Sequence, residues 1–264
     1  MRAPWILGII VAAVPLSACA NGPEVGGEAS AHDPSEGLLR LAADVEAHGQ
    51  DAAALSLYQR AVAASGETPR AYVQLGDASL RAGQIGPAIS AYRAALSKAP
   101  DDGQALLGLG SALVRQGNPE EGLDALARAA PIVKTAAAYG RLGVAQTLVG
   151  QLPEAQASFE TAMALAPDDL DLRTNWALAA ALDGKDDAAV AKMREVVQSP
   201  AAKLRHQRDY VVLLGIIGRV DEARAAAPSG MSPRDLRDLL QRAASIRAMA
   251  TVKDRAKALG TIAG

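Results

Sequence analysis

Small and apolar residues recur at helical spacing along most of the chain. Tyr72 and Leu75 lie three residues apart on one predicted helix, and Ala88, Tyr92 and Ala95 lie four and three residues apart on the next. An equivalent set follows two helix pairs later: Tyr139, Leu142, Ala155, Phe159 and Ala162. The pattern predicts successive pairs of amphipathic helices, so the expected fold class is all-α.

A regular glycine period fixes the register of these pairs. The glycines follow one another at intervals of 34, 34, 33, 34 and 34 residues: Gly49, Gly83, Gly117, Gly150, Gly184 and Gly218. Thirty-four residues is the length of a tetratricopeptide repeat, which consists of a helix, a tight turn and a second helix. The register places each glycine in the turn, where a residue without Cβ can adopt positive φ and end the first helix.

On this register the sequence predicts six helical hairpins, at about 35–68, 69–102, 103–135, 136–169, 170–203 and 204–227. Stacked hairpins bury a continuous core that a single hairpin could not bury. The expected architecture is therefore a right-handed superhelical solenoid of about six hairpins over residues 35–227. Gly76 and Gly143 are expected to let paired helices approach closely, with Tyr92 and Phe159 filling the space between hairpins.

Residues 228–264 are predicted to form a capping helix and a tail. Pro228 and Gly230 end the sixth hairpin, and Ser232 is a suitable N-cap ahead of Pro233. Apolar residues then recur at helical spacing to about residue 249, where we expect the capping helix to end. The remainder, to Gly264, is expected to fray.

The beginning of the chain has the order of an export signal. A positive charge precedes an apolar run from Trp5 to Leu16, which at about 12 residues is too short to span a bilayer as a helix. Residues 1–18 are therefore predicted to be an export signal peptide, which the lipobox described below makes that of a lipoprotein. Residues 19–34 are rich in glycine and proline without apolar periodicity, which predicts a flexible tether.

The signal ends in Leu16-Ser17-Ala18-Cys19, which resembles the lipobox of bacterial lipoproteins. The resemblance implies cleavage before Cys19, a diacylglycerol on its sulfur and an N-acyl lipid on its new amine. Ala20 stands where an aspartate would resemble an inner-membrane retention signal, so we expect the periplasmic face of the outer membrane. A chance cysteine in an ordinary secretory signal is the alternative. No cofactor besides the lipid is expected.

Composition and charge exclude several other classes. The formal net charge of −2 gives no electrostatic basis for a nucleic-acid partner. Cys19 is the only cysteine, so the chain can form neither an internal disulfide nor a cysteine-based metal cluster. Only 3% of the residues are aromatic and 24 are glycine, which favours closely packed helical repeats over a globular enzyme core.

Catalytic motifs are missing from the sequence. It contains no zinc-peptidase, nucleophile-elbow, Walker or dinucleotide-binding pattern. The histidines, His32, His48 and His206, belong to no catalytic pattern, and acidic pairs such as Asp101-Asp102 lie where capping of a helix start explains them. We therefore expect no enzyme activity, no catalytic residue and no metal site.

Function then depends on a surface, and in such a solenoid the first helices line a concave groove. Polar and apolar side chains are interleaved on these helices, a mixture suited to binding an extended peptide or a helix. The candidate binding residues are Arg70, Val73, Gln74, Asp77, Arg81, Gln104, Leu107, Ser111, Arg115, Arg141 and Asn175. A solvated helix face with no dedicated ligand is the alternative.

Two late segments provide a second resemblance. They are Asn175-Trp176-Ala177-Leu178-Ala179, ahead of Gly184, and Tyr210-Val211-Val212-Leu213-Leu214-Gly215, ahead of Gly218-Arg219 and Asp221-Glu222-Ala223. Together with the lipobox and the repeats, they resemble the tetratricopeptide lipoprotein of the tight-adherence (Flp) pilus export apparatus, the TadD-like family. That family commonly has Asn-Leu-Ala where this chain has Asp209-Tyr210-Val211, so the match is partial.

This resemblance implies a non-enzymatic, pilotin-like accessory role in protein export. The partners it implies are the outer-membrane secretin and other pilus-assembly components. A scaffold for outer-membrane barrel assembly or cell-wall synthesis, using the same groove, is one alternative, and a regulatory subunit of an envelope enzyme is another. Each of these functions requires protein or peptide partners.

Overall fold

The computed structural model describes residues 34–65 and 67–260, and within them every regular element is a helix. The predicted signal peptide, the predicted lipidation site Cys19 and residues 19–33 of the predicted tether lie outside the described residues. Among the described helices, none combines the length and the apolar character needed to cross a membrane.

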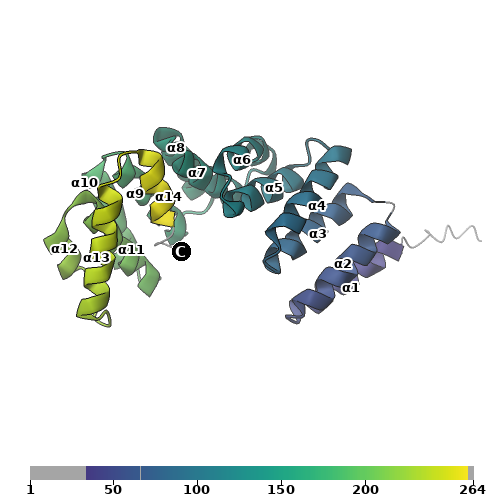
Figure 1. Cartoon of the computed structure of the whole chain (residues 1–264), viewed down its shortest axis with the longest axis horizontal. Helices are drawn as coiled ribbons and strands as arrows, with labels where there is room; N and C mark the ends of the chain where they lie inside the picture. The colour runs from purple at the N-terminus through teal and green to yellow at the C-terminus, as the bar shows by residue number, and fades with distance from the viewer. Residues whose placement is uncertain (1–33, 66, 261–264) are drawn as a thin grey trace, which may run out of the picture. The chain divides into compact units, whose positions relative to one another are not determined.

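Six successive helix pairs follow the glycine period (Figure 1). They are α1 (Pro34–Ala47) with α2 (Asp51–Ala64), α3 (Pro69–Arg81) with α4 (Ile85–Lys98), α5 (Gly103–Gln116) with α6 (Pro119–Val133), α7 (Ala136–Val149) with α8 (Leu152–Leu165), α9 (Leu170–Leu182) with α10 (Asp186–Gln198), and α11 (Leu204–Ile217) with α12 (Val220–Ala225). Each helix packs against its partner, and each second helix from α2 to α10 packs against the first helix of the next pair. The predicted all-α stack of six hairpins is confirmed.

The turn between the paired helices is made by the periodic glycine in every hairpin. All six of these glycines have positive φ, between 73° and 98°. L-residues with a Cβ adopt this conformation only at a cost, so the period reflects a backbone requirement of the turn. Several first helices are capped by side chains: Asp102 Oδ1 accepts the backbone amides of Gln104 and Ala105, both at 2.9 Å.

Aromatic rings fill spaces that glycines leave between helices. A Cβ on Gly76 would lie 2.6 Å from the Tyr92 ring, and a Cβ on Gly108, in the next hairpin, would overlap the same ring. Phe159 packs in the same way against Gly143, where a Cβ would lie 2.7 Å from its ring. Helix approach thus depends on pairing a large side chain with a missing one, as the sequence pattern predicted.

A capping helix follows the sixth hairpin. α13 (Pro233–Arg247) is capped by Ser232, whose Oγ accepts the Asp235 amide at 3.1 Å. It packs on α11 closely enough that a Cβ on Gly215 would lie 2.7 Å from the Ala243 Cβ. The predicted capping helix is confirmed.

The expectation that the rest of the chain frays is wrong for residues 252–260. They form α14 (Val252–Gly260), which contacts α7, α9 and α13. Ala256 and Leu259 are buried there. The helix is ordered because its apolar side chains find cover on the fourth and fifth hairpins, a tertiary effect that local sequence does not reveal.

Candidate functional site

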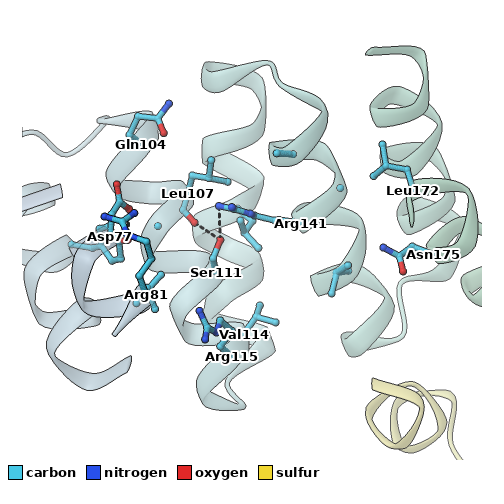
Figure 2. A pocket seen from close by; sticks show the side chains of 17 residues that line it. Asp77, Arg81, Gln104, Leu107, Ser111, Val114, Arg115, Arg141, Leu172 and Asn175 are labelled. Carbon is cyan, nitrogen blue, oxygen red and sulfur yellow. Dashed lines mark hydrogen bonds between the residues drawn. The ribbon is translucent and has the colours of Figure 1, made fainter. Parts of the chain in front are cut away.

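A pocket of about 600 Å³ lies along the first helices of the second to fifth hairpins (Figure 2). Its lining comes mainly from α3, α5, α7 and α9, with Tyr92 and Leu126 contributed by second helices. The repeat places the lining residues at equivalent positions: Gly108, Arg141 and Asn175 each lie nine residues before the turn glycine of their hairpin. We refer to this pocket as the groove.

Two glycines create the space in the groove, and aliphatic side chains form its floor. Gly108 and Gly140 present no side chain, and a Cβ on Gly140 would lie 2.8 Å from Leu172. The aliphatic lining is Leu80, Leu107, Val114, Leu126, Val144 and Leu172. A partner chain can therefore approach the helix backbones and bury small apolar side chains.

Charge in the groove is positive, although the whole chain is slightly acidic. Arg81, Arg115 and Arg141 line it together with one acidic residue, Asp77, which gives a formal charge of +2. Arg141 Nη1 donates to Ser111 Oγ at 3.2 Å, and this serine donates to the Leu107 carbonyl at 2.6 Å. The groove therefore favours partners that bring carboxylates or carbonyl oxygens to the guanidinium groups.

Besides Arg141, which donates to the neutral Ser111 hydroxyl, two of the four charged side chains already have partners within the chain. The Tyr92 hydroxyl donates to Asp77 Oδ1 at 2.6 Å, and burial together with this carboxylate raises the pKa of the Tyr92 phenol, so it remains a donor. Arg81 forms an ion pair with Glu46 of the first hairpin. Arg115, in contrast, has no side-chain hydrogen bond or ion pair to any described residue. Arg115 and Arg141 are consequently the arginines most available to a partner.

Eight of the eleven residues predicted from sequence line the groove, and three do not. Those in the groove are Asp77, Arg81, Gln104, Leu107, Ser111, Arg115, Arg141 and Asn175. Arg70 instead lies 3.9 Å from Glu36 in an exposed ion pair. Val73 packs into the core around Ala88 and Ile89. Gln74 has a buried Oε1 without a hydrogen-bond partner among the described residues. Whether the eight bind a partner stays a prediction.

Sequence reasoning missed the glycine positions of the lining and most of the aliphatic ones. Tyr92 was predicted as a packing residue and also borders the groove. Gly140 and Leu172 were missed because the prediction selected mainly polar side chains and neither residue is polar. Register identifies Gly140, since it lies ten residues before its turn glycine, as Leu107 does in the preceding hairpin.

A second polar cluster lies between α9 and α11 and has a structural role. His206 is 2% exposed; its Nδ1 accepts the Lys203 amide at 3.0 Å, so Nε2 carries the hydrogen that is donated to Asp171 Oδ1 at 2.8 Å. Arg205 binds the same carboxylate through both oxygens. Burial alone would raise the pKa of Asp171, but the hydrogen bonds from Arg205 and His206 outweigh it and lower the pKa.

Asp209 stands next to this cluster and is 8% exposed. Its pKa is raised to about 6, mainly by burial, because the nearby His206 and Arg205 offset only part of the increase that burial causes. Among the described residues, no group of three His, Cys, Asp or Glu side chains could hold a metal ion. The cluster joins two hairpins by hydrogen bonds and ion pairs.

Comparison with known proteins agrees with the repeat architecture. The family model of the cilia and flagella-associated protein 70 middle TPR-like domain matches residues 38–147, and the tetratricopeptide repeat model matches residues 149–203. No curated protein matches the chain in sequence.

Several solved structures share the fold. The pilF protein of Pseudomonas aeruginosa is 17% identical, with 73% of this chain and 86% of that chain covered and a TM-score of 0.60. A thermophilic TPR protein of Thermus thermophilus is 26% identical, with 68% and 98% covered and a TM-score of 0.53. YrrB, a TPR protein with an unusual peptide-binding site, is 21% identical, with 60% and 82% covered and a TM-score of 0.53. The chain belongs to the tetratricopeptide-repeat proteins, which typically are non-enzymatic scaffolds for protein interaction.

Proposed function

We propose that this protein is a non-enzymatic lipoprotein scaffold whose groove binds a segment of a partner protein. The observation that carries the proposal is the groove itself, in which Arg115 and Arg141 stand beside an aliphatic floor. This chemistry suits an extended segment with acidic residues next to small apolar ones. YrrB, a TPR protein with an unusual peptide-binding site, supports the use of such a repeat surface for peptides.

We further propose that the partner belongs to a tight-adherence pilus and that the role is pilotin-like. Support comes from the lipobox-like Leu16-Ser17-Ala18-Cys19 and from the two late segments that resemble the TadD-like family. The partner segment then belongs to the outer-membrane secretin or to another pilus-assembly component. A lipid on Cys19 would hold the groove at the periplasmic face of the outer membrane.

The groove is tested by reversing its two available charges. In the double variant Arg115→Glu and Arg141→Glu, we expect recovery of partner proteins in a cross-linked pull-down from native cells to fall at least about tenfold. The introduced glutamates would repel the carboxylates of an acidic partner segment. A tenfold loss of affinity corresponds to about 1.4 kcal/mol of binding free energy. The readout is quantitative mass spectrometry of the captured proteins.

The matched control is Arg60→Glu. Arg60 is an exposed arginine on α2 that does not line the groove. Equal recovery with the groove variant and with wild type would contradict binding in the groove. Recovery of barrel-assembly or cell-wall proteins without a secretin would support the scaffold role and contradict the assignment to a pilus.

The lipid anchor has its own prediction. Replacing Cys19 by serine removes the sulfur that receives the diacylglycerol, so the protein is expected to move from the membrane pellet to the soluble periplasmic fraction. Two or three acyl chains hold a protein durably to a bilayer, whereas an unlipidated body has no comparable attachment. Fractionation followed by immunoblotting measures the change, with Ser17→Ala as the control that keeps the thiol. Continued pelleting of the Cys19→Ser protein would contradict the anchor.

A further inference from the structure

α14 lies on the first helices of the fourth and fifth hairpins, where the groove ends. It contacts α7 and α9 (Figure 1). Val252, Ala256 and Leu259 pack toward the protein, and their spacing of four and three residues places them on one face of the helix. α14 therefore docks as a short amphipathic helix on the same row of helices that lines the groove.

The surface beneath α14 continues the floor of the groove. A smaller pocket of about 170 Å³ lies between α14 and the two helices below it. Val144 and Asn175 line both this pocket and the groove, and in Figure 2 α14, the pale yellow helix, lies at the Asn175 end of the groove. If α14 were removed, the aliphatic floor would extend over Leu148 and Leu178.

The fit of α14 to this surface is incomplete. Leu259 is buried, yet it borders the pocket beneath α14, so the helix does not fill the space above α7 and α9. Arg255 of α14 has a buried Nε with no hydrogen-bond partner in the described part of the chain, which destabilises the docked state. Lys253 forms an ion pair with Glu120, but both side chains are more than half exposed, so this pair contributes little.

α13 provides a contrast within the same C-terminal region. Its Leu239, Ala243 and Ile246 are buried in a core that they share with α11 and also with Ala256 and Leu259 of α14. Ala243 approaches Gly215 without a gap. α13 thus packs tightly on α11, whereas α14 reaches the same core only through the face that carries Val252, Ala256 and Leu259.

α14 also has the properties of a separable segment. Thr251 caps its start: Oγ1 accepts the Asp254 amide at 3.0 Å and donates to Asp254 Oδ2 at 2.6 Å. The exposed residues 248–251 connect it to α13. A helix of nine residues is unstable alone in water, so α14 is helical only while it is docked.

We propose that the α7–α9 surface is a helix-binding site and that α14 is its built-in, displaceable occupant. The site accepts an amphipathic helix with apolar residues at positions i, i+4 and i+7. Displacement of α14 would lengthen the groove through Asn175 and Leu178 for a partner that presents the same pattern. The inference rests on the proposed function only for the identity of that partner, because docking and release of α14 occur within this chain.

The first test measures amide hydrogen exchange in the full-length wild-type protein. We expect the amides of α14 to exchange at least about 100-fold faster than those of α13, since they open without unfolding of the solenoid. Equal protection of the two helices would overturn the proposal. No partner protein is needed, so a failure here is independent of the pull-down result.

The second test supplies the occupant from outside. A fluorescent synthetic peptide of residues 249–260 is titrated into the full-length Leu259→Asp variant, whose own α14 carries a charge on its apolar face. We expect this variant to bind the peptide at least about tenfold more tightly than wild type does, because its site is vacated. The Leu41→Asp variant, altered at an exposed leucine of α1, should behave as wild type.

Specificity is checked with the same peptide carrying Leu259→Asp, which should not bind. Circular dichroism of both protein variants verifies that the solenoid is folded. Absence of peptide binding to a folded Leu259→Asp protein would overturn the helix-binding site, and equal binding to all three proteins would show that the peptide does not use the surface beneath α14.

Discussion

Replacement of Tyr92 by alanine is expected to lower the free energy of unfolding by about 3–5 kcal/mol. The ring is fully buried and fills the space left by Gly76 in its own hairpin and by Gly108 in the next. Alanine would leave a cavity between two hairpins that rigid helix backbones cannot close. Urea denaturation followed by circular dichroism measures the change.

Tyr92→Phe is the matched control, because it keeps the ring and removes only the hydrogen bond to Asp77. We expect it to cost about 1 kcal/mol, the net value of a typical hydrogen bond. If the alanine variant were no less stable than the phenylalanine variant, ring packing between glycines would not be what joins these hairpins.

Asp209→Asn is expected to stabilise the protein at pH 7.5, by on the order of 2–3 kcal/mol. The pKa of Asp209 is about 6 in the folded chain, against an ordinary value of 3.8. The folded state therefore holds this proton more tightly than the unfolded state does, so stability falls as the pH rises from about 4 to about 6 and stays lower above that range. Asparagine has no charge to bury, so the advantage of the variant should appear across the same interval and vanish below about pH 4.

Asp171→Asn, in contrast, is expected to destabilise the protein at pH 7.5. Hydrogen bonds from Arg205 and His206 lower the pKa of Asp171, so its ionised form stabilises the folded state above the ordinary pKa, and that stabilisation is lost as the pH falls through the folded value. Urea midpoints of both variants and of wild type between about pH 2.5 and 7.5 measure the two effects. An Asp209→Asn protein that is less stable than wild type at pH 7.5 would contradict the account of the α9–α11 cluster.

The fold was predictable because its strongest constraints are local and repeated. Each turn needs a residue that tolerates positive φ, so the glycine period is visible in the sequence before any contact is known. The pairing of Tyr92 with Gly76 recurs as Phe159 with Gly143, and a recurring pair identifies the register. Stacking of neighbouring hairpins then follows, because repeats of this kind contact mainly their neighbours.

The position of α14 was not predictable in the same way. Thr251 and Asp254 give a local signal for a helix start, but nothing in residues 252–260 indicates which surface they cover. The ion pair between Lys253 and Glu120 joins residues 133 positions apart, outside the range of any repeat pattern. Contacts of this kind depend on the assembled solenoid.

The sequence predicted which face of the first helices the groove occupies, but not where along that face there is open space. Register places Gln74 in the same position as Gly108 and Arg141, yet Gln74 does not line the groove. The difference arises because room along a helix face depends on the side chains that neighbouring hairpins contribute, and Gly108 and Gly140 create that room. Equivalent repeat positions therefore predict which way a side chain points, whereas the set of residues that line the groove is known only from the packed structure.

The central claim, that the groove binds a protein partner, is tested most directly by photo-cross-linking in native cells. A photoreactive amino acid is placed at Gln104, an exposed residue of the groove, and in a separate strain at Gln59, an exposed residue of α2 outside it. The account predicts a discrete cross-linked protein at Gln104 that is absent at Gln59 and reduced by Arg115→Glu with Arg141→Glu. No cross-link at Gln104, or the same products at both positions, would contradict it.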